Sequence, residues 1–143
     1  MINPHPPLAA FPFALVLSTL LLESYCIWKR NYAGWKPTLK LLLRGAAVFT
    51  LLSFLSGYYA NQVADGTFQV PDQPIALHHL IGKLALFCVP ACAVIQRFAL
   101  DGEKPAAVLT YRILLLLAAA LVTFTGYLGG ELVFTYGAAV VAG

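Results

Sequence analysis

The chain has 143 residues, of which 60% are hydrophobic and 10% are charged, and its formal net charge is +3. Soluble domains carry about 25% charged residues, so this composition excludes a soluble globular protein and indicates that lipid is the solvent. The length allows a single domain over residues 1–143 without a separate catalytic module, and no basic cluster points to nucleic acid as a partner.

Four apolar segments follow one another along the chain. The first covers about residues 8–28 and contains one charge, Glu23. The others cover about residues 38–60, 74–98 and 109–131. An α-helix rises 1.5 Å per residue, so about 20 residues span the apolar part of a membrane. We therefore predict an all-α integral membrane protein, folded as a four-helix transmembrane bundle.

Prolines and one acidic residue mark the predicted helix starts. Pro12 falls in the first turns of the first helix, where the early N–H groups have no helical partner. His5 lies ahead of two further prolines, so we expect it outside this helix. Asp72 is a candidate N-cap of the third helix, with Pro74 in the first turn.

The basic residues indicate how the helices are oriented. Only Lys83 lies near the loop between the second and third segments. The others gather around the first and third loops: Lys29, Arg30, Lys36, Lys40, Arg44, Arg97, Lys104 and Arg112. Loops rich in Lys and Arg stay in the cytoplasm, so both termini and the loop over 61–73 are expected outside, in the periplasm. We therefore expect a multi-pass protein of the bacterial inner membrane.

Ionisable residues gather at the outer ends of the predicted helices. They include every histidine, the lysine Lys83 and two carboxylates: His5, His78, His79, Lys83, Asp72 and Glu131. The helical repeat places His78 on a stripe of mostly small residues that includes Gly82, whereas His79 shares a stripe with Lys83. Lys83 needs water or an anionic partner, and Glu131 is the nearest candidate. Ionisable groups in membrane helices are costly, so this set is a candidate functional site.

Three hypotheses account for the histidines. In the first, His78 or His79 is an axial ligand of a b-type haem, His5 is the second ligand, and the small stripe through Gly82 leaves room for the flat cofactor. The absence of a CxxCH motif suits a non-covalent haem. The place of His5 ahead of two prolines is awkward for a ligand.

The second and third hypotheses need no haem. In the second, a divalent metal ion binds at the outer surface, with ligands drawn from His5, His78, His79 and Glu131. In the third, the histidines and tyrosines are polar residues of the membrane interface. The sequence contains no nucleophile triad, phosphate loop or metalloprotease motif, so we expect no catalytic activity of its own.

Small residues are expected to serve packing. Ser53 and Gly57 have the small-xxx-small spacing that lets helices approach closely, and so do Gly126 and Gly130. We expect both pairs to act inside the protein. We expect the same packing role for the three cysteines, Cys26, Cys88 and Cys92. Glu23 is expected to be paired or to reach the interface.

Four stretches together resemble a known family. HPPLAAFPFALVL, SGYYANQVADGTF, HHLIGK and GYLGGELVFTYGAAV are similar to the bacterial membrane family called domain of unknown function 2231. The resemblance covers nearly the whole chain and implies a four-helix inner-membrane protein. Members often accompany periplasmic redox proteins and c-type cytochromes, so it also implies redox partners.

The resemblance can be carried over residue by residue. The residues on its motif positions are His5, Pro12, His79, Gly129, Gly130 and Glu131. Many members have further histidines where this chain has Ala10 and Tyr136. Three histidines cannot supply four axial ligands, so we do not expect two haems. We therefore expect an accessory or electron-transfer subunit of a periplasm-facing redox assembly with one haem, or else a cofactor-free structural subunit packed against larger membrane proteins.

Overall fold

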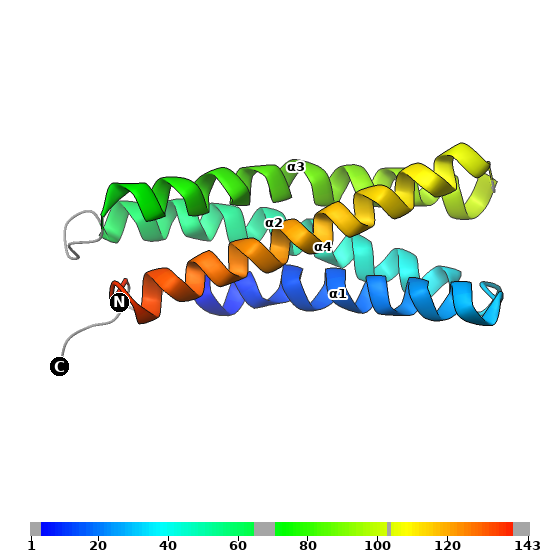
Figure 1. Cartoon of the computed structure of the whole chain (residues 1–143), viewed down its shortest axis with the longest axis horizontal. Helices are drawn as coiled ribbons and strands as arrows, with labels where there is room; N and C mark the ends of the chain where they lie inside the picture. Colours follow the sequence, from blue (N-terminus) through cyan, green and yellow to red (C-terminus); the bar gives the residue numbers. More distant parts are fainter. Residues whose placement is uncertain (1–3, 65–70, 103, 139–143) are drawn as a thin grey trace.

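The computed structural model describes residues 4–64, 71–102 and 104–138, which fold into four long helices (Figure 1). Their bounds are α1 His5–Lys29, α2 Lys36–Ala64, α3 Asp72–Gly102 and α4 Pro105–Phe134. Each helix is long and apolar enough to cross a membrane, and the described residues contain no strand. The predicted all-α transmembrane bundle is therefore confirmed, whereas the side of the membrane that the termini face stays a prediction.

The helices are arranged around the bundle in chain order. α1 packs against α2 and α4, and α3 packs against the same two helices. Successive helices run in opposite directions, as expected for a bundle with short connections (Figure 1). The first residues of α1 and α3 and the last residues of α2 and α4 therefore lie at the same end of the bundle. We call it the histidine end. The connections that follow α1 and α3 lie at the other end, here called the basic end.

All four helices extend beyond the bounds predicted from the apolar segments. α3 begins at Asp72, which therefore lies in the first turn instead of preceding it. α4 begins at Pro105, directly after the N-cap residue Lys104. The backbone hydrogen bonds of a helix do not depend on apolar side chains, so the helices continue into the polar flanks of each segment.

The prediction that His5 lies outside the first helix was wrong. His5 is the first residue of α1, and Pro4 is the N-cap. The two prolines that follow His5 fit here because the first turn has N–H groups without helical partners, and because their fixed φ suits a helix. Pro12 consequently lies within α1, where it is buried. The start of α1 thus gives His5 a fixed place on a helix.

The hydrophobic core fills the middle of the bundle and continues toward the basic end. Its fully buried side chains include Val16, Leu43, Val89 and Leu115. Toward the histidine end, no residue of 4–11, 51–62 or 72–84 is buried. On α4, Leu128 is the one buried residue among 123–138. Among the described residues, the side chains at the histidine end are therefore less buried than those in the rest of the bundle.

Candidate functional site

The structure brings the three histidines together at the histidine end. The rings of His5 on α1 and His78 on α3 have centroids 6.2 Å apart and planes at 84°. The ring of His79 lies 6.2 Å from that of His78, with planes at 51°. The first residue of α1 and two residues about two turns into α3 thus form one imidazole cluster.

Contacts with α2 hold the ring of His5. Its Nδ1 lies 3.1 Å from Oγ of Ser56. The Ser56 hydroxyl donates its own proton to the carbonyl of Ser53 at 2.9 Å, so its oxygen can accept from Nδ1–H. In a neutral ring with this tautomer, Nε2 carries the lone pair. A Cβ at Gly57 would lie 2.8 Å from Cε1 of His5, so the ring occupies space that only glycine leaves.

His78 belongs to the interior face of α3. Along its stripe, Ala85 and Val89 are buried, so the predicted small stripe does face the bundle. A Cβ at Gly129 of α4 would lie 3.3 Å from Cε1 of His78. The Nδ1 atom of His78 is buried and has no hydrogen-bond partner among the described residues. Because buried polar atoms are nearly always paired, this nitrogen indicates a place for a water molecule or a ligand.

The other predicted site residues lie around this pair. His79 is half-buried, and Lys83 on the same stripe is exposed. Gly82 faces α4, where a Cβ would lie 4.0 Å from Cγ2 of Thr125. In the described part of the chain Lys83 forms no ion pair with Glu131. No group of three or more His, Cys, Asp or Glu residues that could hold a metal ion was found among the described residues.

A buried polar network near the basic end was not predicted. Its centre is Glu23 of α1, which is only 2% exposed. The hydroxyl of Tyr32, in the connection after α1, donates to Oε1 of Glu23 at 2.7 Å. Arg112 of α4 forms an ion pair with the same oxygen at 3.2 Å and donates to the Tyr32 hydroxyl at 3.0 Å. Glu23 is therefore paired, which confirms the first of the two alternatives expected for it.

The network also includes α2 and α3. The hydroxyl of Tyr111 donates to Oε2 of Glu23 at 3.3 Å. The side-chain amide of Gln96 donates to the Tyr111 hydroxyl and to the carbonyl of Leu39, both at 3.1 Å. All four helices thus meet at one buried set of hydrogen bonds. The available signal was a glutamate, a glutamine and an arginine within otherwise apolar segments.

The network changes the titration of Tyr32, which lies outside the four spans. Burial is the main cause that raises its pKa to about 12, and its hydrogen bond to Glu23 adds to the rise. The nearby Arg112 acts in the opposite direction. Tyr32 therefore keeps its proton, and its role as a donor, well into the alkaline range.

The packing predictions had mixed outcomes. Cys26 and Cys92 are buried, Cys88 is half-buried, and all three thiols are free. Gly57 acts inside the protein as predicted, by admitting the ring of His5. The prediction for Gly126 was wrong: this residue is exposed, and a Cβ there would meet nothing within 4 Å. Its open face on α4 points away from the other helices.

Comparison with known proteins gives one match. A family model described as "Predicted membrane protein (DUF2231)" matches residues 2–142, which is nearly the whole chain. No curated protein and no solved structure matches the sequence.

Proposed function

The chain belongs to the DUF2231 family of membrane proteins, and from that premise we propose that it is a small inner-membrane accessory or electron-transfer subunit of a periplasm-facing redox assembly. In this proposal His5 and His78 hold one b-type haem near the outer end of the bundle. Its expected partners are larger membrane proteins or periplasmic redox proteins such as c-type cytochromes.

The close approach of the His5 and His78 rings carries the proposal. A histidine nitrogen lies about 2.0–2.1 Å from a metal ion that it binds, so two histidines that hold one group must have rings close together. The rings of His5 and His78 are 6.2 Å apart. The edge of the His5 ring that carries both nitrogens lies against Gly57 of α2, so this ring would have to turn to bind an ion between α1 and α3.

The surroundings of the two rings also suit a ligand pair. Nδ1 of His5 lies 3.1 Å from Oγ of Ser56, and in the tautomer that donates to this oxygen Nε2 would carry the lone pair. A ligating histidine commonly donates its other N–H to a neighbour in this way. His78 keeps a buried nitrogen without a described partner. Few described side chains are buried at this end of the bundle, which further supports a bound group that fills the space between the helices.

Within this proposal the protein supplies position and shelter. A bound haem would supply one-electron transfer. His5 contacts α2, and His78 lies against Gly129 of α4, so both rings have a defined place in the bundle before any cofactor arrives. The metal-ion alternative has less support, because the described histidines, although close together, are not arranged with one another or with a carboxylate as a set of three metal ligands.

Single histidine substitutions test this proposal. Wild-type protein should be purified from cells supplied with haem, and its absorption spectrum recorded before and after reduction. We expect a reducible b-type spectrum that is lost in His5→Ala and in His78→Ala. His79→Ala is the matched control and should keep it, since the proposal does not assign His79 as a ligand. Loss only in the control would contradict the assignment of His5 and His78.

A cofactor-free structural subunit is the second candidate, and one observation favours it. The exposed face around Gly126 has open space, so a helix of a larger membrane protein could approach there. In that case Gly126→Leu removes a stoichiometric partner from a native pull-down, while the histidine variants leave the complex intact. Dependence of the complex on His5 or His78 would count against this candidate.

A further inference from the structure

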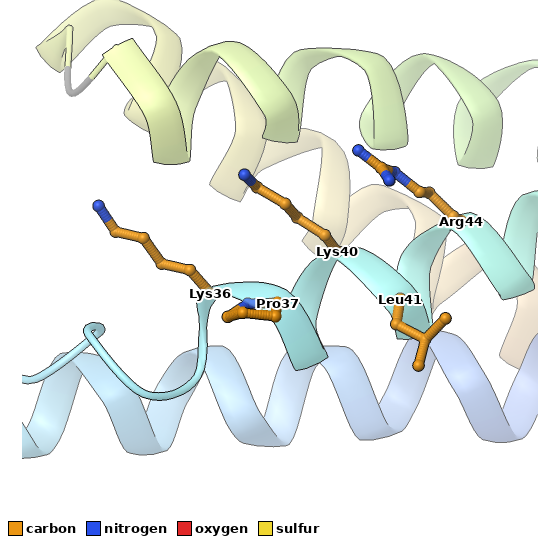
Figure 2. A pocket seen from close by; sticks show the side chains of 5 residues that line it. All are labelled: Lys36, Pro37, Lys40, Leu41 and Arg44. Carbon is orange, nitrogen blue, oxygen red and sulfur yellow. The ribbon is translucent and has the colours of Figure 1, made fainter.

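A basic groove runs between α2 and α3 near the basic end. One part of it is lined by α2 residues, among them Lys36, Lys40 and Arg44. Figure 2 shows that these three side chains leave α2 on successive turns and extend toward α3. Residues four apart lie on the same face of a helix, so the three positive charges form a row along the groove.

A second hollow continues the groove and shares Arg44 with the first. Its volume is about 690 Å³. From α3 it is lined by Arg97 and by apolar residues that include Pro90, Val94 and Phe98. Ligand sites typically measure roughly 300–1,000 Å³, so the hollow is large enough for part of a bound molecule. We call the two hollows together the α2–α3 groove.

The positive charge of the groove is only partly compensated. Lys40 forms an ion pair with Asp101 of α3. Arg44 and Arg97 are exposed, and neither hydrogen-bonds to, or forms an ion pair with, another described residue. Two guanidinium groups therefore line the same hollow from different helices, and Asp101 offsets part of the charge of Arg97.

The order of residues along the groove matches an amphipathic ligand. Arg44 lies about 12 Å along the helix axis from Lys36, at 1.5 Å per residue. Arg97 and Arg44 line the second hollow together, and Val94 and Pro90 follow Arg97 toward the middle of the bundle. Charge thus lies near the membrane surface and apolar surface lies deeper. A guanidinium at this depth is costly without an anion, and its planar donors match a phosphate.

We propose that the α2–α3 groove binds one anionic phospholipid, independently of any cofactor at the histidine end. Its phosphate accepts hydrogen bonds from Arg44 and Arg97, and one acyl chain lies along Val94 and Pro90. Basic pockets between transmembrane helices bind acidic lipid headgroups in this way. A second copy of the chain is a poor occupant, because only 6 acidic residues are spread over the sequence and Glu23 is buried.

Native mass spectrometry of the detergent-solubilised protein tests the proposal. Phosphatidylglycerol, phosphatidylcholine and inorganic phosphate are titrated separately, and the single-adduct fraction gives each affinity. We expect phosphatidylglycerol to bind best, and the double variant Arg44→Gln with Arg97→Gln to lose roughly 25-fold in affinity for it. The double variant Arg30→Gln with Lys104→Gln removes two exposed charges outside the groove and should change affinity by less than about twofold.

A conservative variant separates charge from folding. Arg44→Lys with Arg97→Lys keeps the charge and should keep the preference for phosphatidylglycerol over phosphatidylcholine. Equal binding of the two lipids, unchanged affinity in the glutamine variant, or displacement of the lipid by inorganic phosphate would each overturn the proposal. So would a dimer mass that the glutamine variant abolishes, because the groove would then be an interface between copies of the chain.

Discussion

At the residue scale, the position of the His5 ring depends on a glycine. A Cβ at Gly57 would lie 2.8 Å from Cε1 of this ring, closer than real Cβ contacts. We expect Gly57→Ala to displace the imidazole and to destabilise the protein by about 1–3 kcal/mol, as overpacking commonly does. Thermal unfolding in detergent measures the change.

The matched control for this substitution is Gly126→Ala. A Cβ at Gly126 meets nothing within 4 Å, and alanine favours a helix by up to about 1 kcal/mol over glycine. The control should therefore be neutral or more stable. If Gly57→Ala proves as stable as Gly126→Ala, the close contact between α2 and the His5 ring is wrong.

Tyr32 makes the stability of the bundle depend on pH in the alkaline range. Its folded-state pKa of about 12 lies above the ordinary value of 10.0, so folding favours the protonated phenol. The stability from this group is fully present below pH 10 and is lost as pH rises toward 12. We expect wild-type protein to lose stability in this window, measured by thermal unfolding at a series of pH values.

Tyr32→Phe isolates this effect. Phenylalanine cannot titrate, so the variant should lose less stability than the wild type between pH 10 and pH 12, although it is less stable at neutral pH. Tyr58, exposed on α2 at the opposite end, provides the control substitution Tyr58→Phe. Parallel pH profiles for all three proteins would show that the Tyr32 phenol does not titrate as described.

At the scale of elements, the buried network at Glu23 joins the four helices. Arg112→Ala leaves the buried Glu23 carboxylate without its cation, a loss that costs about 3–5 kcal/mol in buried pairs. Glu23→Ala should cost less, about 1–3 kcal/mol, because it leaves mainly the Tyr111 hydroxyl without an acceptor. The Arg112 side chain is 39% exposed and can then turn toward lipid headgroups.

Melting temperatures in detergent test this order. Ser24→Ala is a suitable control, since Ser24 is next to Glu23 but exposed and bonded only within its own helix. We expect the control to match the wild type, Glu23→Ala to melt lower, and Arg112→Ala to melt lowest. The reverse order of the two network variants would mean that the carboxylate is not held by Arg112.

The elements themselves could be predicted from the sequence because each depends on local properties. A continuous apolar run of sufficient length must form a helix in lipid, since no water is present to pair the backbone groups. The interior stripe through His78 also follows from helical periodicity alone. The exception was the start of α1. His5 was expected outside the helix because two prolines follow it, although prolines also suit a first helical turn.

The buried network could not be predicted, because its partners depend on tertiary register. Glu23 and Arg112 are 89 residues apart in the chain, and their contact requires α1 and α4 to be neighbours at the correct height. From the sequence, Arg112 was considered only as one of the basic residues that set the orientation in the membrane. No partner was predicted for Gln96. For the same reason the distance between His5 and His78 could not be predicted, because it depends on how α1 and α3 are placed in the bundle.

At the scale of the whole molecule, the distribution of basic residues predicts the orientation in the membrane. In a background where the three native cysteines are replaced by serine, single cysteines at Ala33 and Ala138 mark the two ends of the bundle. We expect Ala138→Cys to react with an impermeant thiol reagent in spheroplasts with an intact inner membrane. Ala33→Cys should react only after that membrane is permeabilised. The opposite pattern would invert the bundle and place the histidine end in the cytoplasm.

The central claim is that His5 and His78 together hold one haem. The most direct measurement is the haem content per chain of purified wild-type protein and of the double variant His5→Ala with His78→Ala, both from haem-supplied cells. We predict about one haem per chain in the wild type, the number that one pair of axial ligands can hold, and none in the double variant. A colourless, iron-free wild type, or a haem that the double variant retains, would contradict the account.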